Sequence, residues 1–280
     1  MTWTLKSLAA AAAFVAAGST SAFTATLNTN DTLVDYGVTL SGLSGTGTLT
    51  FSSVLIGALN AGKVTATGLS PATATVTYKT NNATKVVSIA TASAAAPIQS
   101  LQIDLTNDGL TLQKVNALGG ARLTAANANI ATTGGFLEVS NLSVDLSAKK
   151  VFATLNGGNG VGLLNNVELW DIATITGPIS YDLSSPPSYY YSFGFTNTVS
   201  GLKINANAYN LFATSLGLTA NGKLSLSTVT DFGTITSTVS ITVGLDDAIT
   251  PDVPEPATYA LVAVGLLAAN LATRRRRAKQ

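Results

Sequence analysis

The sequence predicts an all-β fold: an antiparallel β-sandwich or barrel-like ectodomain with one or two short helices, plus an N-terminal signal peptide and a C-terminal transmembrane helix. Two observations lead to the β prediction. The apolar residues of the central part recur with a period of two, which is the period of a β-strand. Thr, Ser and Asn alternate with them, which is typical of antiparallel sheets that have one face in water.

Four segments show this alternation most clearly. The ranges 48–51, 73–78 and 100–105 each place apolar residues on one face and polar residues on the other. The clearest case is 234–243, in which Ile235 and three later apolar residues share a face while threonines and serines line the opposite one. We expect each segment to form a half-buried strand.

A hairpin is predicted at residues 137–155. Its strands are 137–146 and 149–155, joined near Ser147-Ala148. The phase of the apolar residues changes at Ser140-Asn141, and a β-bulge there would explain the change.

Two segments have the spacing of helices. In 206–216 the apolar residues recur at helical intervals, with Asn205 or Asn207 as the N-cap and Gly217 just past the end. A second helical turn is expected at 52–60. We expect residues 23–251 to form one ectodomain, with the Ala-rich run 92–97 as the candidate break if there are two subdomains.

The N-terminus resembles a secretory signal peptide over residues 1–22. Lys6 precedes the apolar run 8–18, and Thr20-Ser21-Ala22 supplies the small residues that signal peptidase reads. Signal peptidase is therefore an expected partner, with cleavage after Ala22. The alternative is a buried Ala-rich helix.

The C-terminal segment, 252–280, is acidic and proline-rich, then apolar, then basic. Residues 257–273 predict a transmembrane helix of about 25 Å, which is near the lower limit for crossing a bilayer. The basic residues that follow would stop transfer and stay in the cytoplasm, so the ectodomain would lie outside. These membrane-stop residues are Arg274, Arg275, Arg276 and Arg277.

Within this segment, Val253, Pro254, Glu255 and Pro256 followed by a short apolar helix and an arginine run resemble the PEP-CTERM sorting signal of Gram-negative bacteria. The resemblance covers about a tenth of the chain. It implies that an exosortase-type membrane processing enzyme recognises these four residues and that the body passes to the cell surface or the extracellular matrix. The alternatives are a permanent single-pass anchor and a GPI tail, and the arginine run disfavours the latter.

Composition excludes several kinds of chemistry. The chain has no Cys and no His, so it cannot form a disulfide, a Cys/His zinc site or a Ser-His-Asp triad. Charged residues make up only 10% of the chain, and five basic residues lie in its last seven positions, so nucleic acid is not an expected partner. We expect no enzyme activity, no catalytic residue, no metal and no cofactor.

Two groups of side chains are candidates for chemistry or binding. Glu138, Glu168 and Asp171 are the carboxylates near aromatic residues that a glycosidase would need, but nothing in the sequence pairs them. The candidate ligand contacts are Trp170, Tyr189, Tyr190 and Tyr191, because flat aromatics with polar tips stack on sugar rings. The alternative is that the aromatics of 189–193 alternate into the core.

These observations predict an exported, non-enzymatic structural or adhesive protein of the cell surface or biofilm matrix. It would pass through an inner-membrane intermediate, and exopolysaccharide is a candidate partner. The alternatives are a carbohydrate-binding or carbohydrate-active ectodomain and a permanently anchored single-pass envelope protein.

Overall fold

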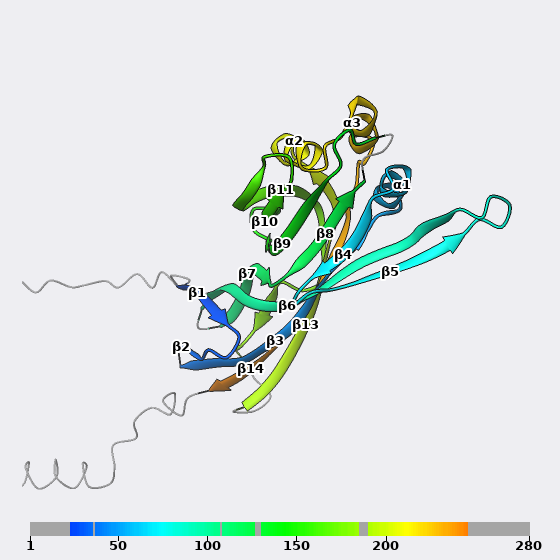
Figure 1. Ribbon diagram of the computed structural model, residues 1–280. Helices are drawn as coiled ribbons and strands as arrows, with labels where there is room; N and C mark the ends of the chain where they lie inside the picture. The colour runs from blue at the N-terminus through cyan, green and yellow to red at the C-terminus, as the bar shows by residue number, and fades with distance from the viewer. Residues whose placement is uncertain (1–22, 36, 107, 127–129, 185–189, 246–280) are drawn as a thin grey trace, which may run out of the picture.

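The computed structural model describes residues 23–245, apart from 36, 107, 127–129 and 185–189 (Figure 1). The predicted signal peptide and the sorting segment therefore lie outside the described residues. The strands are β1 (Phe23–Asn28), β2 (Leu33–Asp35), β3 (Val38–Phe51), β4 (Thr65–Leu69), β5 (Thr73–Thr80), β6 (Val87–Leu105), β7 (Gly109–Ala117), β8 (Gly120–Ala125), β9 (Gly135–Asp145), β10 (Lys150–Gly157), β11 (Gly162–Thr176), β12 (Ser180–Asp182), β13 (Tyr190–Ile204) and β14 (Gly233–Leu245). The helices are α1 (Ser53–Ala61), α2 (Ala206–Ser215) and α3 (Ala220–Ser227).

The described strands form one large antiparallel sheet that closes on itself. The pairing order runs β7-β6-β3-β14-β13-β11-β10-β9, and β9 pairs again with β7. We call these eight strands the ring. The prediction of an antiparallel all-β fold is confirmed, and the closure favours the barrel-like alternative.

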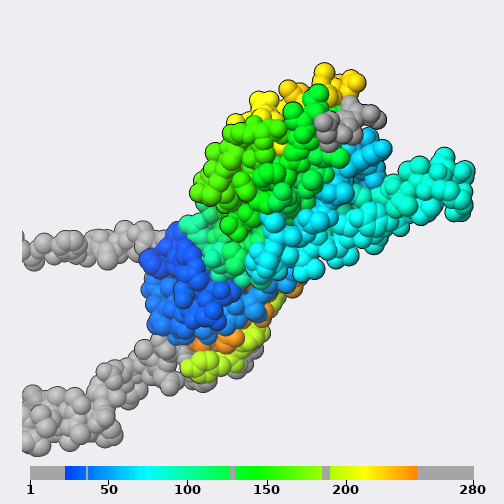
Figure 2. Space-filling view, in the orientation of Figure 1, coloured from blue at the N-terminus to red at the C-terminus, as the bar shows by residue number. Residues whose placement is uncertain are grey.

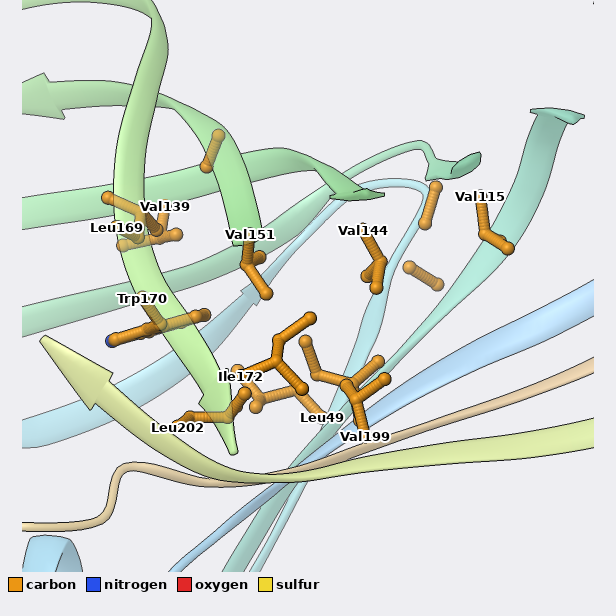
Figure 3. Close-up of a cluster of buried hydrophobic side chains, with 14 of the residues drawn as sticks. Leu49, Val115, Val139, Val144, Val151, Leu169, Trp170, Ile172, Val199 and Leu202 are labelled. Carbon is orange, nitrogen blue, oxygen red and sulfur yellow. The ribbon is translucent and has the colours of Figure 1, made fainter. Parts of the chain in front are cut away.

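The interior of the ring is an apolar core supplied by alternate residues of its strands. Leu40, Leu101, Leu155 and Ile241 have no measurable exposure to solvent. Figure 3 shows further core side chains, from Leu49 on β3 round to Leu202 on β13, pointing toward one another across the interior. Burying each such Leu or Ile contributes about 1.5–3 kcal/mol relative to leaving it in water, so this core is the main source of stability.

The three helices of the described chain gather at one end of the ring, which we call the capped end (Figure 1). The side chains of Ser52, Asn205 and Thr219 accept hydrogen bonds from backbone N–H groups in the first turns of α1, α2 and α3. The helices predicted at 52–60 and 206–216 are confirmed. Helix α3 was not predicted, because only two of its residues, Gly222 and Leu226, are buried and it shows no helical apolar stripe.

The hairpin of β9 and β10 contains the predicted bulge. Phe152 pairs with Ser143 and Thr154 with Ser140, so β9 has one more residue than β10 in this interval. Asn141 provides it, with φ of +52°. Its backbone N–H and its side-chain oxygen bond Gly119 O and N, at 2.9 and 3.2 Å, so the bulge ties β9 to the turn before β8.

Residues 92–97, where the sequence allowed a domain break, lie in the middle of β6. The first part of this strand pairs with β5, Ser93 to Pro97 pair with β3, and the last part pairs with β1 and β7. One strand therefore joins the ring to a hairpin of β5 and β6 that projects from the body, which we call the arm (Figure 2). The secondary structure shows no break at 92–97.

Both ends of the described chain lie away from the helices. Phe23 pairs with Leu105, and Leu245 pairs with Val38 at the opposite end of β3 from α1 (Figure 1). No helix within the described ranges is long and apolar enough to span a membrane. The helix predicted at 257–273 lies beyond those ranges.

Candidate functional site

The predicted aromatic contacts are not brought together by the structure. Trp170 on β11 pairs with Ile204, whereas Tyr190 and Tyr191 pair with Gly244 and Val243 at the other end of β13. At about 3.3 Å per residue, Tyr191 and Ile204 are roughly 40 Å apart along this strand. Tyr189 lies outside the described residues, so any ligand contact there stays a prediction.

The described aromatics of 190–193 alternate between solvent and core, as expected if they belong to a half-buried strand. Tyr190 is 72% exposed, while Tyr191 is half-buried and Phe193 is buried. Phe193 stacks on Tyr181 of β12 with 3.9 Å between ring centroids, and Tyr191 packs beside both rings. Burial raises the pKa of the Tyr191 phenol, and the negative charge of Asp182 acts in the same direction. This aromatic group lies at the start of β13, the opposite end of that strand from α2.

The candidate carboxylates are bound by cations on neighbouring strands. Lys150 Nζ contacts Glu168 at 2.5 Å and Asp171 at 3.1 Å. The hydrogen bond that Lys150 donates to Glu168, followed by the one it donates to Asp171, raises the pKa of Lys150. Glu138 instead accepts from Arg122 at 2.9 Å. Glu138 therefore has a different cationic partner from Glu168 and Asp171, which share Lys150.

Trp170 faces the interior. It is 3% exposed, and its ring centroid lies 5.8 Å from that of Phe232. The Phe232 centroid in turn lies 6.2 Å from that of Phe212. These three residues border an apolar cavity of about 90 Å³ between the ring and the helices. The sequence did not predict this cavity, because its walls come from segments that are far apart along the chain.

The outer surface of β3, β14 and β13 carries a regular array of hydroxyl groups. In the pairing register Thr48, Thr236 and Thr198 form one row, and Thr46, Thr238 and Thr196 form the next. A further row consists of Thr50, Thr234 and Ser200. We call these nine residues the hydroxyl face.

The geometry of the hydroxyl face follows from that of a sheet. Neighbouring strands lie about 4.8 Å apart, and residues on one face repeat about every 6.7 Å along a strand. Hydroxyls bond across strands, with 3.0 Å between Thr198 and Thr236 and 3.2 Å between Thr196 and Thr238. All nine residues are uncharged, and each is at least partly exposed. The alternation predicted at 234–243 gave one strand of this face, but the two neighbours required knowledge of the pairing.

Comparison with known proteins identifies the tail. The family model described as the PEP-CTERM protein-sorting motif matches residues 252–277. The tail therefore carries this sorting motif, as the resemblance at Pro254, Glu255 and Pro256 implied, and the motif implies export and surface or extracellular targeting through an exosortase-type enzyme. No curated protein and no solved structure matches the chain.

Proposed function

We propose that the chain is a non-enzymatic adhesive protein of the cell surface or extracellular matrix, and that the hydroxyl face is its adhesive surface. The PEP-CTERM motif supports the destination. The single observation that supports adhesion is the uncharged array of nine Thr and Ser residues on three paired strands. The partner we propose is a neutral exopolysaccharide.

The chemistry of the hydroxyl face suits a neutral glycan. Each Thr or Ser hydroxyl has one donor hydrogen and two acceptor lone pairs, so it can bond to sugar hydroxyls in either direction. A single such bond contributes only about 0.5–1.5 kcal/mol, but a repeating polymer meets many of them at once. Because no ion pair is involved, we expect binding to change little with salt concentration.

Binding is tested by co-sedimentation of the full chain with its host's exopolysaccharide and with cellulose. The variant T236V/T238V removes two hydroxyls at the centre of the face while keeping the branched shape. The matched control is T77V/T91V, which removes an exposed hydroxyl pair of the arm that is bonded at 2.6 Å. We expect the first variant to lower the bound fraction at least about threefold and the control to leave it unchanged.

Two results would contradict the adhesive assignment. One is equal sedimentation of the wild type and both variants. The other is binding that high salt abolishes, since charged groups elsewhere on the protein would then be responsible.

For export we propose cleavage by signal peptidase after Ala22, an inner-membrane intermediate held by residues 257–273, and processing at the motif. Intact mass spectrometry of the protein from host membranes and medium, beside a Glu255→Ala variant, tests this route. A released product that ends near Val253 to Pro256 and is lost in the variant supports it. Full-length protein that starts at Phe23 and remains in the membrane supports the permanent anchor instead.

A carbohydrate-active ectodomain is the competing proposal. It would have to use Glu168 or Asp171, which share Lys150, or Glu138, which Arg122 binds. Release of reducing sugar from the exopolysaccharide that is lost in Glu138→Gln or Glu168→Gln would support this alternative over the non-enzymatic function.

A further inference from the structure

The cavity at the capped end is lined by two kinds of wall. The ring supplies one wall from β3, β6, β7, β9 and β11, and Figure 3 shows Leu49, Val115, Val144 and Trp170 from this region converging on the interior. The helices supply the other, with Leu55 and Leu59 of α1 among its members. Phe212 of α2 and Leu226 of α3 also line this side of the cavity.

The cavity exists because small residues occupy core positions on neighbouring strands. Gly47 of β3 pairs with Ala96 of β6, and Ala117 of β7 pairs with Ile98. All four line the cavity. Near the other end of β6 the inward positions are Leu101 and Ile103, which are fully buried. Protein interiors are close-packed, so small side chains that leave space beneath the helices are a departure from ordinary packing.

One of the lining residues, Trp170, also carries a polar atom that the fold leaves unpaired. Trp170 Nε1 is buried and has no hydrogen-bond partner among the described residues. A buried N–H group without a partner costs about 1–3 kcal/mol, and nearly all such groups in native proteins are satisfied. A bound molecule with one acceptor atom would satisfy it. The lining residues include no Asp, Glu, Lys or Arg, so the wall offers no compensation for a ligand charge.

We propose that the capped end is a binding site for a small, neutral, hydrocarbon-rich molecule that places one hydrogen-bond acceptor at Trp170 Nε1. Apolar cavities on the order of 100 Å³ stay free of water and take up small apolar molecules. This site is separate from the hydroxyl face, because its walls are the inward residues of the same sheet. The proposal therefore does not depend on the adhesive function.

Photolabelling with 3-trifluoromethyl-3-phenyldiazirine, a small neutral aromatic, tests the site on the full chain as its host exports it. Labelled peptides are mapped by mass spectrometry, so labelling of the tail is separated from labelling of the cavity. We expect label on peptides that contain the lining residues of β3, β6 and α1. The variant Ala96→Leu fills the cavity and should reduce this label about tenfold.

The matched control is Ala95→Leu, because Ala95 is the adjacent residue on the outer face of the same strand and should leave labelling unchanged. Gly47→Ala is a milder second variant, since its added Cβ would lie 3.5 Å from Ile98 Cδ1, an ordinary contact. Thermal unfolding of each variant establishes that it is folded. Equal labelling in the wild type and Ala96→Leu, or an unlabelled cavity in the wild type, would overturn the proposal and leave a packing void.

Competition tests the role of Trp170. Acetophenone and ethylbenzene have similar shapes, but only acetophenone carries an acceptor. We expect acetophenone to displace the label about fivefold more effectively, and this advantage to disappear in Trp170→Phe while ethylbenzene still competes. If the two compounds compete equally in the wild type, Nε1 does not bind the ligand and the assignment of an acceptor is wrong.

Discussion

Asp145 is the charged residue on which the closure of the ring depends most directly. It is 6% exposed and pairs with Lys114 where β9 meets β7. Its carboxylate accepts from Lys114 Nζ at 3.0 Å and from Ala148 N and Ser147 Oγ at 2.8 Å each. Burial by itself would raise the pKa of Asp145, but these hydrogen bonds outweigh burial and lower it. The folded protein therefore stabilises the charged form.

Replacing Asp145 by Asn tests this role. We expect the free energy of unfolding to fall by about 1–2 kcal/mol, because Lys114 loses its partner at the β7–β9 junction. Chemical denaturation measures the change. The control Asp171→Asn removes an exposed carboxylate and should cost less than about 0.5 kcal/mol. Equal losses in the two variants would show that the position of Asp145 at the junction gives it no special importance.

The lowered pKa of Asp145 also predicts how stability depends on pH. The unfolded carboxyl titrates near its ordinary value of 3.8, and the folded one titrates at lower pH. The stabilisation is therefore complete well above 3.8 and is lost as the pH falls through the folded pKa. Unfolding free energies measured from about pH 6 to pH 3 should decline less steeply in Asp145→Asn than in the wild type. Parallel curves would rule out this residue as the cause.

At the scale of single elements, the arm depends on the ring but the ring does not depend on the tip of the arm. Tyr78, Val86 and Val87 are each about 60% exposed. The last buried anchor toward the tip is Ile89, whose backbone N–H and C=O bond the side chain of Asn60 in α1 at 2.7 and 2.9 Å. Everything beyond Ile89 lies outside the core.

Shortening the arm tests this division. Replacing residues 79–88 by Asn-Gly keeps Tyr78 and Ile89 and supplies a two-residue hairpin turn. We expect the free energy of unfolding to change by less than about 0.5 kcal/mol. Asn60→Ala should cost more, about 1–2 kcal/mol, because it leaves two buried backbone groups unpaired. The reverse order, measured by thermal unfolding, would mean that the tip contributes to folding.

The elements differ in how well the sequence predicted them. Helix α2 was predicted with its cap because Asn205 and the apolar spacing are local signals, and the bulge at Asn141 was predicted because the phase change is local too. Helix α3 lacks such a signal. The pairing of β7 with β9, the rows of the hydroxyl face and the cavity all join residues that are distant in sequence. Periodicity shows which face of a strand is buried but not which strand lies beside it, so Trp170 could be placed in a strand but not at a cavity wall.

At the scale of the whole molecule, the two ends of the described chain, Phe23 and Leu245, both lie away from the helices. Strand β14 ends at Leu245, several residues before the motif at 252–277. Its pairing with β3 runs from Gly233 to Leu245 and so involves no residue of the motif. We therefore expect the released protein and the retained Glu255→Ala protein to unfold at the same temperature, within about 2 °C. Differential scanning calorimetry of both forms measures this. A clearly lower value for the released form would mean that the tail contributes to the stability of the body.

The closed ring has a further consequence for a chain with so few charges. Open sheets that expose a long, uncharged outermost strand can add strands from other molecules and grow into fibres. Each of the eight ring strands has two neighbours but is not paired on both sides along its whole length, since residues 190–197 of β13 pair with β14 alone and β11 pairs with β13 only over Trp170–Thr176. Edge-to-edge growth would have to use these singly paired stretches, short strands such as β4, or the arm, whose outer part carries Lys79 and Lys85 as repelling charges.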